Sequence, residues 1–212
     1  MPLVEKIHTI MGLFLPASVF TYTREGEGGF MTTEQESPPA IHQSNIDETI
    51  IWVMEEYGES LKRFIFTYVK SRSQTDDIFQ EVLLVIYHKI DTFQGKSSFK
   101  TWLYRITANK CKDYLRSPVH RVISLKDQFK ERESDQTPES SLIEVERKHE
   151  LIDAIMALPI KYREVLILQY YKEFSIKEMS ELLKVNSSTV KTRIMRAKDK
   201  LKQSLKEDYL DE

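Results

Sequence analysis

The sequence predicts an all-α protein in which two small helical domains are joined by a flexible linker. Apolar residues recur at three- and four-residue spacing through most of the chain after position 45, which is typical of amphipathic helices. The 212 residues include only six glycines and seven prolines, too few for the frequent turns of a β-rich fold. Apolar side chains make up 41% of the chain, which is enough to build hydrophobic cores.

The first 45 residues are expected to form no fold, because residues 32–44 are polar and include two adjacent prolines. A stretch rich in Glu and Gly, residues 25–30, stands directly before Met31, and codons for these residues can spell a ribosome-binding sequence. We therefore expect translation to start at Met31 in the cell. An ordinary flexible tail is the alternative.

Three helices are expected in the first domain, residues 46–116. The first follows an apolar stripe from Ile46 to about Lys70. The second is expected to begin at Thr75, a good N-cap residue, to carry acids in its first turn and to run to about Thr92. A polar loop separates it from the third helix, which is predicted for Phe99–Arg116 because Pro118 follows.

The chain after the third helix is predicted to be a linker, residues 117–141, because it is charged and lacks periodicity. The second domain, residues 142–206, is expected to begin with a helix over Leu142–Leu158. Pro159 then suits the first turn of a helix that reaches about Lys172. An acidic tail, residues 207–212, ends the chain.

The end of the second domain has the pattern of a helix-turn-helix unit. Ser175 and Glu178 form a capping box that opens a short helix ending at Leu183, a tight turn follows, and a longer basic helix begins at Ser187. Such a helix can dock in the major groove of DNA, although helical hairpins that bind protein look similar. Its expected buried face consists of Val190, Ile194, Ala197, Leu201 and Leu205. Its expected outward face consists of Lys191, Thr192, Met195, Arg196 and Lys198.

Two basic segments occur in a chain whose net charge is only −2. Residues 96–116 hold six basic side chains against one acid, a net charge of +5, and residues 184–206 hold eight against one, a net charge of +7. Two polyanion contacts are one interpretation, and lysine-rich solvated helix faces are the other. The segment Phe99–Arg105 mixes aromatic and basic residues as sites for single-stranded DNA do. The alternative is that Trp102 and Leu103 are ordinary core residues.

The sequence gives little support to enzyme chemistry. Asp76 and Asp77 could suggest a metal-dependent nuclease or phosphohydrolase, but no further carboxylate or histidine cluster accompanies them. Cys111 is the only cysteine, which excludes an internal disulfide. Residues 95–97 lack the earlier glycine of a phosphate-binding loop. No apolar run reaches the roughly 18 residues of a membrane span. We therefore expect no catalysis, no metal, no cofactor and no membrane insertion.

Several longer motifs carry a family resemblance. The segments 76–82 (DDIFQEV), 91–95 (DTFQG) and 99–110 (FKTWLYRITANK) resemble region 2 of the extracytoplasmic-function sigma factors, a group in the sigma-70 family of bacterial RNA polymerase. The segments 157–166 (ALPIKYREVL), 175–179 (SIKEM) and 188–198 (STVKTRIMRAK) resemble region 4 of the same group. Both occur in the expected order with a linker between them.

The resemblance implies a cytoplasmic, non-enzymatic protein that brings RNA polymerase to promoters and helps to open the DNA, in response to an envelope or stress signal. The implied partners are core RNA polymerase, the −35 and −10 elements of promoter DNA, and an anti-sigma factor. The implied polymerase-binding residues are Asp77, Gln80 and Glu81. The implied −10 DNA-binding residues are Phe93, Gln94, Gly95, Lys96, Ser97, Ser98, Phe99, Trp102, Asn109 and Lys112. The implied −35 DNA-binding residues are Ser187, Ser188, Thr189, Lys191, Thr192, Arg193, Met195, Arg196 and Lys198.

Two positions depart from the family pattern. Lys184 stands where a turn glycine is expected, so either a non-glycine residue adopts the left-handed conformation, at a cost of about 1 kcal/mol, or the turn shifts. Trp102 is followed by Leu103, where primary sigma factors have two adjacent tryptophans, which implies weaker melting and stricter promoter dependence. A helix-turn-helix regulator that acts without polymerase is the alternative function, although it leaves residues 76–116 unexplained.

Overall fold

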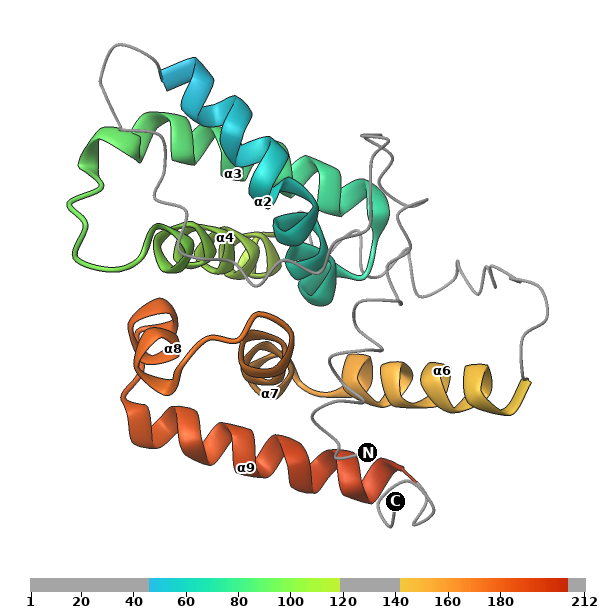
Figure 1. Ribbon diagram of the computed structural model, residues 1–212. Coiled ribbons are helices and arrows are strands. Elements are labelled where there is room, and N and C mark those ends of the chain that lie inside the picture. Colours follow the sequence, from blue (N-terminus) through green and yellow to red (C-terminus); the bar gives the residue numbers. More distant parts are fainter. Residues whose placement is uncertain (1–45, 119–141, 206–212) are drawn as a thin grey trace.

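The computed structural model describes residues 46–118 and 142–205, with side chains of the second segment described from Glu150 onward (Figure 1). Helices and no strands occur in these two segments, so the all-α prediction is confirmed. The predictions for residues 1–45, 119–141 and 206–212, including the start at Met31, lie outside the described residues.

The first domain consists of three long helices around an apolar core. Helix α2 spans Ile46–Val69, α3 spans Arg72–Lys89, and α4 spans Phe99–Arg116; a short 3-10 turn, η2, covers Ile90–Thr92. All three helices contact one another. Helix α3 buries an apolar stripe formed by Ile78, Val82 and Ile86, and the third helix has the predicted bounds. The fully buried side chains that join the three helices include Leu61, Phe64, Ile65, Ile78, Val82, Ile86, Leu103 and Tyr104.

The prediction that Thr75 caps the second helix is wrong. Helix α3 begins three residues earlier, at Arg72, with Ser71 in the N-cap position. Thr75 is fully buried, and its hydroxyl donates to the Ser71 carbonyl at 2.8 Å instead of capping a helix. The acids that follow therefore lie in the second turn, and Asp76 pairs with Lys62 of α2 at 2.8 Å. Burial of the apolar face decides the start of this helix over local capping preference.

The second domain contains four helices and a wide π-helical turn. Its elements are α6 (Leu142–Ala157), α7 (Ile160–Leu166), the π turn η3 (Ile167–Tyr171), α8 (Ile176–Leu183) and α9 (Ser187–Ser204). Pro159 takes the N-cap position of α7, one residue before the helical turn in which it was expected. Its missing N–H costs nothing there, because the first N–H groups of a helix have no partner within the helix.

The two domains pack against each other. Helices α7 and α8 lie between the first domain and α9, so that α4 and α9 are on opposite sides of this middle layer (Figure 1). Helix α4 contacts α8, and α2 contacts α7. Arg163 of α7 is buried in the junction, where its guanidinium donates to the Thr67 carbonyl of α2 and, at 2.8 Å, to the Leu158 carbonyl. The two basic helices therefore belong to one packed unit in this structure.

Candidate nucleic-acid interface

The helix-turn-helix unit has the predicted local geometry. The Glu178 N–H donates to the Ser175 hydroxyl at 3.3 Å, and the Ser175 N–H donates to the Glu178 carboxylate at 2.9 Å, which makes a complete capping box. Lys184 ends α8 in the left-handed conformation, with φ 55° and ψ 45°. A non-glycine residue thus occupies the turn, and the unit keeps its form. The next helix is capped by Asn186, whose side chain accepts from the Thr189 N–H at 2.7 Å.

Helix α9 buries one face and exposes the other, as predicted. Every member of the predicted buried stripe, from Val190 to Leu205, is buried. Ser187, Ser188, Lys191, Thr192 and Arg196 are exposed, whereas Thr189 and Lys198 are half-buried. Met195 is 57% exposed and adds apolar surface to this face. These side chains form one outward surface of polar, basic and apolar character, the mixture that base edges and phosphates require.

Arg193 differs from the other predicted −35 residues. It is half-buried, and its guanidinium binds the Glu164 carboxylate of α7 at 3.1 Å. The structure therefore turns this side chain toward the protein and away from the outward surface of α9. The reason is its place in the helix, because position 193 lies between Val190 and Ala197 of the buried stripe. At the border of the buried face, the Arg193 guanidinium is close enough to α7 to pair with Glu164.

Two tyrosines from α7 and η3 support the basic surface, and the sequence analysis missed both. The Lys198 amine lies 5.1 Å from the ring centroid of Tyr170, and the Lys200 amine lies 5.9 Å from that of Tyr162. The Arg196 guanidinium hydrogen-bonds the Tyr162 hydroxyl. Rings in this position hold the flexible cations of α9 close to α7 and η3. The signal available in the sequence was the pair of tyrosines in a segment otherwise rich in aliphatic residues.

The loop between η2 and α4 carries the predicted −10 residues. Gln94, Gly95 and Lys96 are exposed, and Gly95 has a φ of +65°, a conformation that glycine adopts without strain. Ser97 is half-buried. Ser98 caps α4, because its hydroxyl accepts from the Thr101 N–H at 3.1 Å. A structural role for Ser98 is thus visible beside the predicted contact with DNA.

An aromatic cluster lies beneath this loop. Phe93 is half-buried, and its ring centroid lies 5.3 Å from that of Phe99 and 5.5 Å from that of Trp102. Phe99 and Trp102 are only 6% and 5% exposed, so in this structure both are core residues that support Phe93. Trp52 of α2 joins the cluster, with its centroid 5.8 Å from that of Phe99. Trp52 was missed because it lies some forty residues before the motif that it supports.

The structure separates Asn109 and Lys112 from the Phe93 cluster. Both lie in the second half of α4, where they line a cavity of about 440 Å³ between the domains, and Phe93 is not among the lining residues. Lys112 binds the Glu164 carboxylate at 2.9 Å. The residues expected to bind the −10 element therefore lie at two places along α4. Its first turn carries the aromatic rings, and its second half carries Asn109, Lys112 and Arg116.

The predicted polymerase-binding residues share one face of α3. Asp77, Gln80 and Glu81 are exposed, and Glu81 also pairs with Lys110 of α4 at 2.6 Å. Leu84 and Tyr87, one turn and two turns beyond Gln80, extend this face with apolar surface at 60% and 42% exposure. The sequence analysis missed them, although neither belongs to the buried stripe of this helix. We call these five residues the α3 docking face.

In residues 46–118 and 142–205, no group of three or more His, Cys, Asp or Glu side chains is arranged to hold a metal ion. Nor does any helix in the described part of the chain combine the length and the apolar character needed to cross a bilayer.

Comparisons with known proteins agree with this architecture. The family model of sigma-70 region 2 matches residues 53–119, and that of sigma-70 region 4 matches residues 148–201. The ECF RNA polymerase sigma factor SigX of Bacillus subtilis is 30% identical over 175 residues, which cover 79% of this chain and 90% of SigX. SigW of the same organism is 29% identical over 164 residues, with 73% and 88% coverage.

Solved structures show the same fold. The sigma factor RpoE from Bartonella quintana, determined in complex with the anti-sigma factor NepR, aligns with a TM-score of 0.57 at 23% identity, over 76% of this chain and 96% of that chain. CnrH, determined in complex with the cytosolic domain of CnrY, aligns with a TM-score of 0.54 at 22% identity, over 76% and 89%. Together with the two region models and the similarity to SigX, these likenesses establish that the chain belongs to the extracytoplasmic-function sigma factors of the sigma-70 family.

Proposed function

We propose that this sigma factor binds core RNA polymerase through the α3 docking face, reads the −35 element with α9, and helps to open the −10 element with α4 and the loop before it. The protein directs polymerase to promoters, as its family membership establishes. The observation that carries the residue assignments is the combination, in one chain, of an outward basic helix in a helix-turn-helix unit and an acidic-apolar face on a separate domain.

The α3 docking face is suited to a protein partner. Its acidic side chains are exposed and surround Leu84, and apolar surface bordered by charge is typical of protein interfaces. DNA would be repelled by the two carboxylates of this face. We therefore assign it to the polymerase, with basic residues on the polymerase side.

The outward surface of α9 is suited to the major groove of DNA. Lys191, Thr192 and Arg196 lie on consecutive turns of one face, and the arginine has the two parallel donors that guanine accepts. Ser187 and Ser188, at the helix N-terminus, are placed to meet a phosphate. On the first domain, Phe93 offers a half-buried ring to an unpaired base, because Phe99 and Trp102 hold it from below.

An anti-sigma factor is a further proposed partner, and the cytoplasm is the proposed location. The solved structures of RpoE with NepR and of CnrH with CnrY support the first proposal. The residues that the structure describes contain no membrane-spanning helix, which is compatible with the second. A regulator that acts without polymerase would leave the α3 docking face without a purpose.

The docking proposal is tested with the double variant Asp77→Ala and Glu81→Ala. We expect its affinity for core RNA polymerase to fall at least about tenfold, because interface residues of this kind contribute more than about 1 kcal/mol each. The matched control is Glu55→Ala with Glu56→Ala, which removes two exposed acids from α2 and should leave the affinity unchanged. Equal affinities for both double variants, measured by titration with labelled core enzyme, would remove α3 from the interface.

A further inference from the structure

The junction between the domains contains a carboxylate that is held by both DNA-binding helices. Glu164 of α7 has a side chain only 2% exposed. Lys112 of α4 binds it at 2.9 Å, Arg193 of α9 binds it at 3.1 Å, and the Tyr68 hydroxyl of α2 donates to it at 2.9 Å. Burial, together with the neighbouring carboxylate, raises the pKa of Tyr68 well above its ordinary value, so this hydroxyl keeps its proton. We call these four residues the Glu164 clasp.

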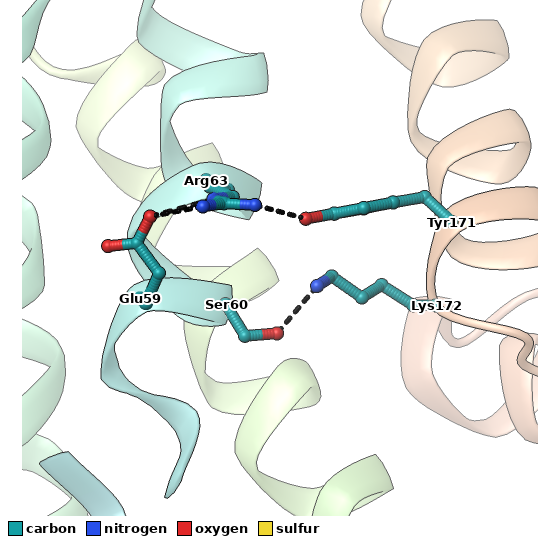
Figure 2. Close-up of polar contacts among 5 residues, drawn as sticks. All are labelled: Glu59, Ser60, Arg63, Tyr171 and Lys172. Atoms are coloured by element: carbon teal, nitrogen blue, oxygen red, sulfur yellow. Dashed lines mark hydrogen bonds and ion pairs between the residues drawn. The ribbon is translucent and has the colours of Figure 1, made fainter. Parts of the chain in front are cut away.

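A second set of polar contacts joins the same domains (Figure 2). Arg63 of α2, which is held by Glu59 at 2.7 Å, donates to the Tyr171 hydroxyl of η3 at 3.1 Å. The Lys172 amine donates to the Ser60 hydroxyl at 2.6 Å. In one of these contacts the first domain supplies the donor, and in the other the second domain supplies it. These two sets of polar contacts join the domains beside the buried Arg163 and the rings of Tyr104 and Phe174, whose centroids lie 5.1 Å apart.

The Glu164 clasp occupies cations that the DNA would need. Lys112 and Arg193 belong to the two basic segments, and a cation bound to a buried carboxylate is not available to a phosphate. The cavity of about 440 Å³ beside the clasp is lined by Asn109, Lys112, Arg116 and Arg193. Lys112 and Arg193 are thus occupied by Glu164 while the domains are together, whereas Asn109 and Arg116 at the same cavity stay exposed, as does the outward surface of α9.

We propose that the packed arrangement is an autoinhibited state of the free sigma factor, in which Glu164 takes the place of DNA phosphate on Lys112 and Arg193. The inference rests on the proposed function, because it requires α4 to bind DNA. The polymerase, by binding the domains separately, releases both cations for contact with DNA. DNA that is already single-stranded is the ligand most affected, since α4 belongs to the −10 domain.

The geometry favours a switch over a permanent structural ion pair. A buried carboxylate that needs two cations from two domains loses its partners when the domains part, but it then regains water. All three charged groups are therefore satisfied in either arrangement. A purely structural carboxylate would be paired within its own domain, as Glu59 is with Arg63 in α2. The clasp is consequently a contact that can open without unfolding either domain.

The test compares Glu164→Gln with Glu181→Gln in the full-length free protein. Both substitutions remove one negative charge from the second domain, but Glu181 is exposed on α8. We expect Glu164→Gln to bind a labelled single strand of about 20 nucleotides at least about tenfold more tightly than the wild type, in fluorescence anisotropy at low salt. The slope of log K against log salt should become more negative by about 0.7 for each additional phosphate that the released cations neutralise. The radius of gyration of Glu164→Gln, measured by small-angle scattering, should exceed that of the wild type.

A second variant reaches the same prediction without touching the clasp. Ser60→Ala with Tyr171→Phe removes the acceptors of the two contacts in Figure 2 that join the domains, and it leaves every predicted DNA-binding residue in place. It should also bind the single strand more tightly and scatter as a more extended particle. Circular dichroism confirms for each variant that the helices are retained, so a variant that unfolds is replaced by the other.

The outcomes separate this inference from the proposed function. If Glu164→Gln and Glu181→Gln raise the affinity by the same factor, the effect is one of net charge and the clasp is not inhibitory. If neither Glu164→Gln nor the Ser60–Tyr171 variant binds the single strand more tightly while both bind core polymerase normally, the inference is overturned and the sigma-factor assignment stands. If the wild type and all variants fail to bind core polymerase, the proposed function itself fails.

Discussion

Helices α4 and α9 carry similar charge in the sequence and present it differently in the structure. In α9, Lys191 and Arg196 are exposed, and Arg196 contacts the neutral hydroxyl of Tyr162. In α4, Lys110 is paired with Glu81, and Lys112 with Glu164. The Lys100 amine is bound to the Lys172 carbonyl at 2.8 Å. A run of basic residues therefore measures how much positive charge a helix holds, while its availability depends on acids and carbonyls that other helices bring to it.

The difference has a functional meaning. The −35 element is recognised as intact duplex, so a helix that reads it can be exposed at all times. The −10 element must be bound as opened DNA, and a surface for single strands that was always exposed would bind any single-stranded nucleic acid in the cell. In the autoinhibited state proposed above, Glu164 occupies Lys112 of α4 until the polymerase binds, which avoids this competition. Three experiments break or sharpen the comparison between the two helices.

The largest expected effect concerns the stability of the packed form. Lys112→Met leaves buried Glu164 with a single cation, and removing one partner of a buried ion pair costs about 3 kcal/mol or more. Lys191→Met removes the same charge from the exposed face of α9 and should change stability by less than about 0.5 kcal/mol. Denaturant unfolding of the free protein measures both. Equal losses of unfolding free energy in the two variants would show that Lys112 and Lys191 contribute equally to stability, against the comparison made here.

The sequence was most informative where local signals decide the structure. The bounds of α4, the capping box of α8 and the buried stripe of α9 all follow from periodicity and capping within a few residues. The left-handed Lys184 was one of two alternatives that the sequence left open, and the structure has it. Such features could be predicted because each is stabilised by neighbours in the sequence.

Features that depend on distant residues could not be predicted. The start of α3 at Arg72 is set by burial against α2, which overrides the capping preference of Thr75. The orientation of Arg193 is set by Glu164, some thirty residues earlier, and the role of Lys112 by the same acid, more than fifty residues later. An acid inside the apolar segment 157–166 was the one sequence signal of a buried ion pair.

The second experiment concerns base reading by α9. Arg196→Ala should cost about 1–3 kcal/mol of holoenzyme binding at one −35 base pair, because arginine is the usual bidentate partner of guanine. Lys198→Ala should weaken all sequences alike and lower the salt dependence by about one unit, since its amine, held over the Tyr170 ring, is placed for a phosphate. Binding to single-base −35 variants at two salt concentrations separates the two. A uniform loss for Arg196→Ala would make it a phosphate contact.

The smallest expected effect is a dependence of the packed form on pH, and it arises at Lys172. Burial, with Arg63 of α2 and Lys100 of α4 nearby, lowers the pKa of this amine from an ordinary value of 10.5 to about 7, and Glu59 opposes the shift only in part. The Tyr171 ring, 3.9 Å from the amine, completes its surroundings. When the domains part, the amine returns to water and to an ordinary pKa. The open form therefore binds more protons than the packed form between about pH 7 and pH 10.

It follows that the packed form gains stability as the pH rises from 7 toward 9, by at most about 1.4 kcal/mol, or tenfold, per pH unit. We expect the affinity of the free protein for single-stranded DNA to fall over this range, because the open fraction falls. Lys172→Met removes the titrating amine, keeps an unbranched side chain and leaves α4 and α9 unchanged, so its affinity should depend on pH much less steeply. Since any loss of charge from the DNA-binding lysines is common to both proteins, the difference between the two pH profiles isolates the junction. If the affinities of the wild type and of Lys172→Met change with pH in parallel, Lys172 keeps the same protonation in both arrangements. The packing of the two domains would then be independent of this amine.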